Sequence, residues 1–250
     1  MMLHHIIQAH GGTLPDDVLV TFANTGKERP ETLDFVRDCG EHWDVDIHWL
    51  ERDPKTKFRE VYYEKAAREG EPFADLIKSK KYLPNPVARF CTGELKIKVI
   101  SLFALAQGFD DGWSNVVGLR HDEPSRVAKM KARNEVDKWD NDMPMDTAKL
   151  TKRDVAAFWY GQNFDLGLPN INGTTPMGNC DLCFLKGAAT LQGIMRANPG
   201  ASDWWQKQEA EIGLFRSDRP SYAAMQKAVD DQDEFDFGDA DSLGDCFCTD

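Results

Sequence analysis

The fold class is decided by three consecutive segments: Val18-Leu19-Val20-Thr21-Phe22, Ala23-Asn24-Thr25-Gly26-Lys27-Glu28-Arg29 and Pro30-Glu31-Thr32. The first five residues are a continuous β-rich run, which is typical of a strand buried on both faces in a parallel sheet. The last three predict the start of a helix, because proline fits a first helical turn and an acidic residue there suits the helix dipole. The seven residues between them therefore connect a strand to a helix.

The neighbouring segments extend this pattern. Residues 1–10 predict a helix, because their apolar side chains share one helical face. Residues 47–50 and 115–118 predict further short strands. The order helix–strand–helix–strand favours an α/β fold with a doubly wound, mostly parallel sheet. In such sheets ligands bind at the carboxyl ends of strands, so residues 24–28 are a candidate binding site by position.

The second half of the chain differs in character. We expect residues 127–150, which are highly charged, to be a mobile excursion. A loop rich in Gly, Pro and Asn leads to Cys180, and helices are expected at 184–197, 202–212 and 220–229. The expected organisation is an α/β nucleotide-binding domain over 1–170, followed by a helical, cysteine-bearing segment over 171–250 that ends in an acidic Cys-x-Cys tail.

Composition bounds the class of protein. The chain has 250 residues, of which 41% are hydrophobic and 29% charged, as in ordinary soluble globular proteins. No run approaches the roughly 18 apolar residues of a membrane helix, and no signal-peptide pattern opens the chain, so we expect a cytoplasmic protein without membrane contact. The net charge of −12 argues against binding along a nucleic-acid backbone, which relies on a basic face.

Six cysteines in a cytoplasmic chain are more often ligands, redox centres or buried thiols than disulfides. Cys39 lies within a helical pattern and is expected to be a buried structural thiol. Cys180-x-x-Cys183 favours a metal or cluster site over a thioredoxin-type redox pair, because such a pair normally opens a helix after the first strand of a βαβ unit. Four thiolates bind zinc or a [4Fe–4S] cluster, and the spacing leaves both open.

Further ligands must come from elsewhere in the chain. Cys91 is expected near a helix start, where the dipole favours a thiolate, although a buried thiol is an equally frequent explanation. The tail cysteines Cys246 and Cys248 are candidates for a fourth ligand or for a mobile nucleophile. Lys96 would place a cation beside a cluster or a bound anion.

A second group of residues suits an anion. Arg120 follows a predicted strand, next to Gly118, which permits close backbone approach, and Arg126 comes shortly after. Phosphate or sulfate is the ligand class expected there, with surface ion pairs as the alternative.

Four segments together resemble a known family. They are Phe22-Ala-Asn-Thr-Gly-Lys-Glu-Arg-Pro-Glu-Thr-Leu33, Phe90-Cys-Thr-Gly-Glu-Leu-Lys-Ile97, Val117-Gly-Leu-Arg120 and Cys180-Asp-Leu-Cys183. In order and spacing they are similar to motifs of the phosphoadenosine phosphosulfate reductase family, within the adenine nucleotide α-hydrolase-like (PP-loop) superfamily. The resemblance covers about residues 15–190.

The resemblance implies an oxidoreductase or sulfur transferase that binds an adenine nucleotide and acts on a nucleotide sulfate or another activated sulfur. It also implies an electron donor such as thioredoxin and allows a homo-oligomer. By position, Cys91, Cys180 and Cys183 would bind a [4Fe–4S] cluster, with zinc as the alternative. Asn24, Thr25, Gly26 and Glu28 would line the nucleotide site with Gly118, Arg120 and Arg126. Cys246, Cys248 and Lys96 would be the catalytic residues, and Cys246 could instead be the fourth ligand.

The chain departs from the family pattern in two places. The family's paired cysteines are here the single Cys91, preceded by Phe90. The superfamily also begins with a strand and a Ser-Gly-Gly phosphate loop, whereas this sequence begins in what we expect to be the following helix. Two other functions therefore stay open: sulfur insertion into nucleic acid, as in tRNA thiolation or DNA phosphorothioation, and a non-catalytic nucleotide-binding protein stapled by zinc or a cluster.

Overall fold

The computed structural model describes residues 1–231, which form a mixed α/β structure with two small sheets. In the first sheet, β1 (Val20–Asn24) pairs in parallel with β2 (Ile47–Asp53), and β2 pairs antiparallel with β3 (Lys57–Val61). In the second, β4 (Ser114–Val116) and β5 (Asp140–Asp142) are parallel. Within residues 1–231 the two sheets are separate, so the single doubly wound sheet expected from the sequence is not seen as such.

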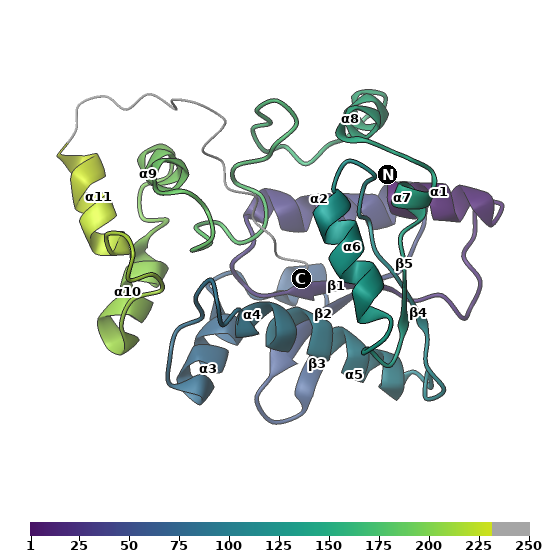
Figure 1. Ribbon diagram of the computed structural model, residues 1–250, viewed down its shortest axis with the longest axis horizontal. Coiled ribbons are helices and arrows are strands. Elements are labelled where there is room, and N and C mark those ends of the chain that lie inside the picture. The colour runs from purple at the N-terminus through teal and green to yellow at the C-terminus, as the bar shows by residue number, and fades with distance from the viewer. Residues whose placement is uncertain (232–250) are drawn as a thin grey trace.

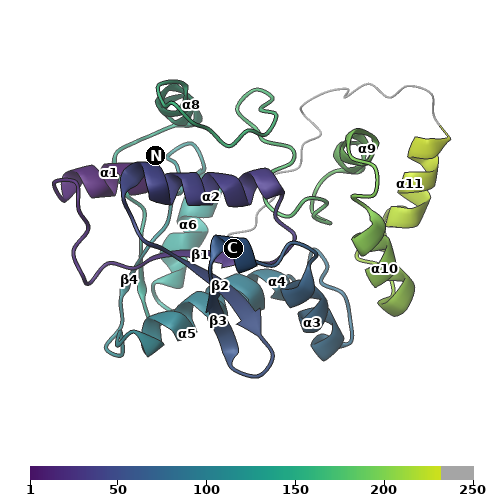
Figure 2. The same ribbon diagram turned by 180° about the vertical axis from the view of Figure 1, so that it is seen from behind.

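Helices cover both faces of the three-stranded sheet (Figures 1 and 2). On one face, α2 (Pro30–Trp43) buries Leu33 against Trp49 of β2. On the other, α5 (Lys98–Ala106) buries Val99 and Phe103 against Leu50. Successive strand residues point to opposite faces, which is why the adjacent Trp49 and Leu50 serve different helices. Figure 2 shows α1 (Met2–Ala9) on the same side as α2.

One continuous helical segment carries two of the predicted site residues. It starts as α4 (Phe90–Thr92), passes through a π-helical turn at Gly93–Ile97 and continues as α5. Single π-helical turns within α-helices occur frequently at functional sites. Cys91 lies in its first turn and Lys96 in the π-helical turn.

Residues 127–150 are not an excursion from the fold, so this expectation is wrong. They contribute to α6 (Pro124–Arg133), β5 and α7 (Pro144–Thr147). Val127, Met130 and Met143 are buried against Leu119 in a small core of their own. The charged side chains around them occupy the exposed faces. Because the charged residues outnumber the apolar ones, the apolar stripe is not evident in the sequence.

The three C-terminal helices agree with the sequence pattern. A capping box of Thr151 and Asp154 opens α8 (Lys152–Tyr160). The C-terminal helices α9 to α11 lie together at one end of the molecule (Figure 1). The largest buried cluster joins α3 to these helices, so the segments before and after residue 170 share a core. The other bounds are Tyr63–Lys65 for a 3-10 turn, Glu71–Lys80 for α3, Ala188–Ala197 for α9, Asp203–Ile212 for α10 and Tyr222–Asp230 for α11.

Candidate cysteine site and anion cavity

Three predicted ligands line one small cavity, called here the cysteine cavity. Cys91 comes from α4, and Cys180 and Cys183 come from the loop before α9, residues 178–187, called the cysteine loop. Thr25 and Lys96 line the same cavity. Cys180 and Cys183 are buried, and Cys91 is partly exposed. The fold therefore brings residues from three distant segments to one cavity.

The connection between β1 and α2 is shaped by Asn24. Its side chain is fully buried, and Nδ2 donates hydrogen bonds to Glu51 Oε1 at 2.7 Å and to the carbonyl of Ala67 at 2.9 Å. Its Oδ1 accepts from the backbone N–H of Gly26 at 3.0 Å. The amide of Asn24 is thus used in holding the loop, and it is Thr25 that reaches the cysteine cavity.

Glu28 links the loop to the cysteine cavity. Its buried carboxylate accepts through Oε2 from the backbone N–H of Thr25 at 2.9 Å and from Thr25 Oγ1 at 2.8 Å. Its Oε1 lies 3.5 Å from Lys96 Nζ. Thr25 Oγ1 lies 3.7 Å from Cys180 Sγ. Because the hydroxyl hydrogen of Thr25 is donated to Glu28, the thiol of Cys180 is the donor in this contact.

Two glycines let the β1–α2 connection approach a second loop closely. Gly26 and Gly70 both have φ of +78°, in the left-handed region. A Cβ on Gly26 would lie 3.0 Å from the Cα of Gly70, and a Cβ on Gly70 would lie 2.5 Å from Trp204 Nε1. Side chains are therefore excluded at both positions by contact as well as by conformation.

A buried ion pair ties the same connection to the cysteine loop. Lys27 Nζ lies 2.9 Å from Asp181 Oδ2, with side chains only 8% and 14% exposed. Trp205 Nε1 donates to Asp181 Oδ1 at 2.9 Å, and the backbone N–H of Asp181 donates to the carbonyl of Lys27 at 2.7 Å. Sequence reasoning missed Lys27 and Asp181, although Asp181 lies between the two cysteines of the motif.

Sequence reasoning also missed Lys186, whose side chain holds the main chain of the cysteine loop. Its ammonium is buried and donates to the carbonyls of Gly178 at 2.7 Å, Cys180 at 2.7 Å and Asp181 at 3.2 Å. The hydroxyl of Tyr222 donates to the carbonyl of Leu182 at 2.6 Å. Burial raises the pKa of Tyr222 well above its ordinary value, which keeps this hydroxyl protonated. The side chains of Lys186 and Tyr222 thus hold the main chain of the loop.

The arrangement of donors bears on which metal group fits. Among residues 1–231, no three His, Cys, Asp or Glu side chains are grouped so as to hold a single metal ion. The cysteine cavity measures about 20 Å³, room for about one water molecule. Any larger group requires the walls of this cavity to move apart.

The predicted arginines line a larger cavity of about 570 Å³, called here the anion cavity. Arg120 Nε donates to Asp122 Oδ1 at 2.8 Å, and Arg126 forms an ion pair with Glu123, so the expected surface ion pairs are also present. Burial acts to raise the pKa of Asp122, but hydrogen bonds from the Lys152 backbone N–H and from Arg120 outweigh it and lower that pKa. Charged residues lining the cavity are Arg120, Arg126, Lys152 and Lys186, with Asp122 and Glu123.

Other predicted residues lie apart from these cavities or outside the described part of the chain. Gly118 faces Met2 and Met145, and it is not among the residues that line the anion cavity. Cys39 is buried, as predicted, and burial raises the pKa of its thiol to about 11. Cys246 and Cys248 lie outside the described residues.

A third cavity, of about 290 Å³, lies beside β1 and shares Thr92 and Lys96 with the cysteine cavity. It is called here the strand-edge cavity. Phe22, Ile100 and Trp139 give it an apolar lining. Lys96 therefore stands between a cavity that suits an apolar ring and a cavity lined by thiols.

Comparison with known proteins adds one relative. No family model and no solved structure matches the chain. The chain is similar to a protein of Escherichia phage lambda named as an uncharacterized nin region protein, ORF290. The two are 27% identical over 180 residues, which is 68% of this chain and 57% of the phage protein. The chain thus matches little more than half of that relative's length. Within residues 1–231, no helix has the length and apolar character needed to cross a membrane.

Proposed function

We propose that the chain is a phosphoadenosine phosphosulfate reductase-like enzyme, an oxidoreductase or sulfur transferase acting on an adenine nucleotide sulfate or another activated sulfur. The observation that carries the proposal is the convergence of Cys91, Cys180 and Cys183 on one cavity beside Lys96. A doubly wound, adenine nucleotide α-hydrolase-like fold is part of the proposal. It is supported by the parallel β1–β2 pair and by helices on both faces of its sheet.

Cys91, Cys180 and Cys183 would hold a [4Fe–4S] cluster. Zinc draws its thiolates to about 2.3 Å from a single point, whereas the thiolates of a cluster bind different irons and stay further apart. Zinc, which thiolates also bind, is the alternative. A cluster of this type supplies a redox centre whose potential depends on hydrogen bonds to its sulfurs and on solvent exposure. Lys96 would offset the negative charge of the thiolates.

The anion cavity would take the phosphate or sulfate group of the substrate. Its charged lining has four basic and two acidic side chains, so it favours an anion. The strand-edge cavity would take the adenine base against its apolar lining, with Asn115 and Asn141 as polar partners. Lys96 would then lie between the base and the thiols.

The chemistry proposed is attack of a cysteine thiolate on the sulfur of the nucleotide sulfate. A bond forms between the two sulfurs while the bond from the sulfate sulfur to the phosphate oxygen breaks, and the nucleotide leaves. A dithiol donor such as thioredoxin then supplies two electrons and releases sulfite, forming a disulfide in the donor. Cys246 or Cys248 would be the nucleophile, or Cys246 a fourth ligand.

The test is anaerobic purification followed by visible absorption and by iron, sulfide and zinc analysis. We expect iron and sulfide in equal amounts in the wild type. Cys91→Ser, Cys180→Ser and Cys183→Ser should each lose them, while Cys39→Ser, a buried cysteine outside the site, keeps them. Colourless protein with stoichiometric zinc would overturn the proposal in favour of a zinc-stapled, non-catalytic protein.

The tail cysteines need a separate measurement. Sulfite release from adenylylsulfate and from phosphoadenylylsulfate, with thioredoxin as reductant, tests the reaction itself. Loss of turnover with unchanged iron in Cys246→Ser or Cys248→Ser would mark the nucleophile, whereas loss of iron would mark a ligand. Absence of sulfite from both substrates with an intact cluster would reject the reductase reaction.

A further inference from the structure

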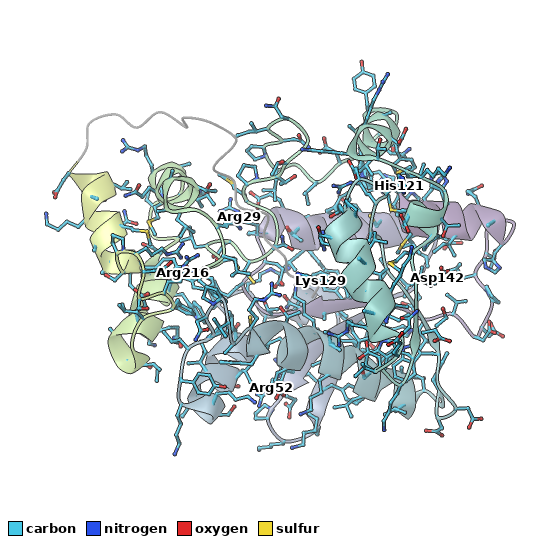
Figure 3. The ribbon with its side chains drawn as sticks, in the orientation of Figure 1. Arg29, Arg52, His121, Lys129, Asp142 and Arg216 are labelled. Atoms are coloured by element: carbon cyan, nitrogen blue, oxygen red, sulfur yellow. The ribbon has the colours of Figure 1, made fainter. Side chains whose placement is uncertain are left out.

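Lys186 belongs to the cysteine loop and also lines the anion cavity. Its side chain is 4% exposed, and its ammonium holds the carbonyls of Gly178, Cys180 and Asp181. The same residue lines the anion cavity together with Arg120 and Arg126. Figure 3 shows the side chains that fill the region between the C-terminal helices and the rest of the molecule, with Arg29 at this junction, where it donates to Asn198. Lys186 is thus in contact with both parts of the candidate site.

The hydrogen-bonding capacity of this ammonium is fully used. A lysine ammonium has three N–H donors and no acceptor. Lys186 Nζ has three carbonyl acceptors, at 2.7, 2.7 and 3.2 Å. Within residues 1–231 no carboxylate is paired with it. A buried cation is stabilised by a nearby negative charge, so an oxyanion in the anion cavity is attracted to Lys186.

An anion that accepts a hydrogen bond from Lys186 must displace one of the three carbonyls. The longest and weakest of the three bonds is the one to Asp181, at 3.2 Å. Asp181 stands between Cys180 and Cys183, and its side chain is held by Lys27 and Trp205. Release of its carbonyl therefore loosens the main chain of the Cys-x-x-Cys turn while its side chain stays anchored.

We propose that Lys186 is a positioning residue that couples oxyanion binding in the anion cavity to the accessibility of Cys180 and Cys183. The inference rests on the proposed function only in assigning the cavity a phosphate or sulfate group. Its consequence is that the thiols, or the group they hold, become more reactive when the anion is bound. Reactivity at the sulfur centre is then tied to occupancy of the substrate site.

Lys152 provides a matched control in the same cavity. Its ammonium lines the anion cavity and donates to Thr174 Oγ1 at 3.1 Å. Neither it nor Thr174 belongs to the cysteine loop. Lys152→Met therefore removes one cavity cation and leaves the carbonyls of the cysteine loop held, whereas Lys186→Met removes both a cavity cation and the support of the loop.

The experiment measures the alkylation of Cys180 and Cys183 by iodoacetamide in metal-free protein, resolved by peptide mass spectrometry, with and without inorganic sulfate or phosphate. Chloride at equal ionic strength is the reference. On protein as purified, the rate of iron loss to a chelator is the parallel measurement. In the wild type we expect sulfate to speed alkylation by about fivefold or more. Fivefold is about the smallest effect that is typical of coupling between two binding sites. Lys152→Met should show the same increase at higher sulfate concentration.

Lys186→Met should alkylate fast without sulfate and show no further increase. Lys186→Arg keeps the charge and has five donors, so it can hold the loop and an anion together, and sulfate should leave its alkylation rate unchanged. General stabilisation by sulfate would slow alkylation equally in all variants. The inference is overturned if sulfate and phosphate do not bind the wild type, if they bind without changing the rate, or if the increase survives in both Lys186 variants. Absence of iron from the wild type would reject the cluster and leave the alkylation result standing.

Discussion

The ion pair between Lys27 and Asp181 gives the sharpest test of how the candidate site is held together. Its two side chains are 8% and 14% exposed and meet at 2.9 Å. Breaking one partner of a buried pair costs about 3–5 kcal/mol, because the other charge is left without compensation. In Asp181→Asn, the ammonium of Lys27 retains the ring of Trp204, 5.2 Å from its centroid. The amide oxygen of the new residue can still accept from Trp205, so the loss is mainly that of the charge.

We expect Asp181→Asn and Lys27→Met each to lower the free energy of unfolding by about 3 kcal/mol or more. For a chain of this length that corresponds to a fall in melting temperature of roughly 6–12 °C. The double variant carries neither charge, so its loss should fall short of the sum of the two single losses by about 1–3 kcal/mol. Urea unfolding of metal-free protein, followed by tryptophan fluorescence, measures all four free energies. Additive losses, or single losses below about 1 kcal/mol, would refute the reasoning.

Two further predictions concern the scaffold. Gly70→Ala should lower the free energy of unfolding by about 2–5 kcal/mol, because left-handed backbone strain adds to a contact of 2.5 Å with Trp204. Gly11→Ala, at φ of +77° with no atom within 4 Å, should cost only about 1–2 kcal/mol, and equal losses in the two variants would contradict this account. Cys39, with its pKa raised to about 11 by burial, should resist iodoacetamide at neutral pH in the native protein and react in urea. Its native state retains the proton that the unfolded thiol loses near pH 8.5, so stability should fall as pH rises from there toward 11, and Cys39→Ala should flatten that part of the pH profile.

The sequence predicts the elements whose apolar periodicity is unbroken. The helix after Pro30 and the strand before Asn24 are confirmed, because their patterns match a single period. The sequence analysis missed β3. This edge strand, Lys57–Val61, carries mostly charged side chains and therefore has no clear apolar pattern. The helix at 124–133 is missed for a related reason, since its apolar stripe is outnumbered by exposed charges.

Some residues of the candidate site could be predicted from the sequence, and others are recognised only in the fold. The cysteines could be grouped from their chemistry, and the structure brings three of them to one cavity. The roles of Asn24 and Lys27 could not be predicted, because each depends on partners that are distant in the sequence. Asn24 bonds to Glu51 and Ala67, and Lys27 bonds to Asp181. Long-range polar pairing of this kind has no periodic signature in the chain.

The contact between Thr25 and Cys180 also fixes an order of events during synthesis. The two residues are 155 positions apart, so at about 5–20 residues per second the ribosome delivers Cys180 roughly 8–30 s after Thr25. From its own synthesis until residues 188–230 follow, the apolar face of α3 lacks the C-terminal helices that cover it in the finished protein. A nascent chain therefore passes through a period in which Phe73, Leu76 and Ile77 are open to chaperones and to aggregation. Any metal group bound by Cys91, Cys180 and Cys183 can be loaded only after Cys183 has been made.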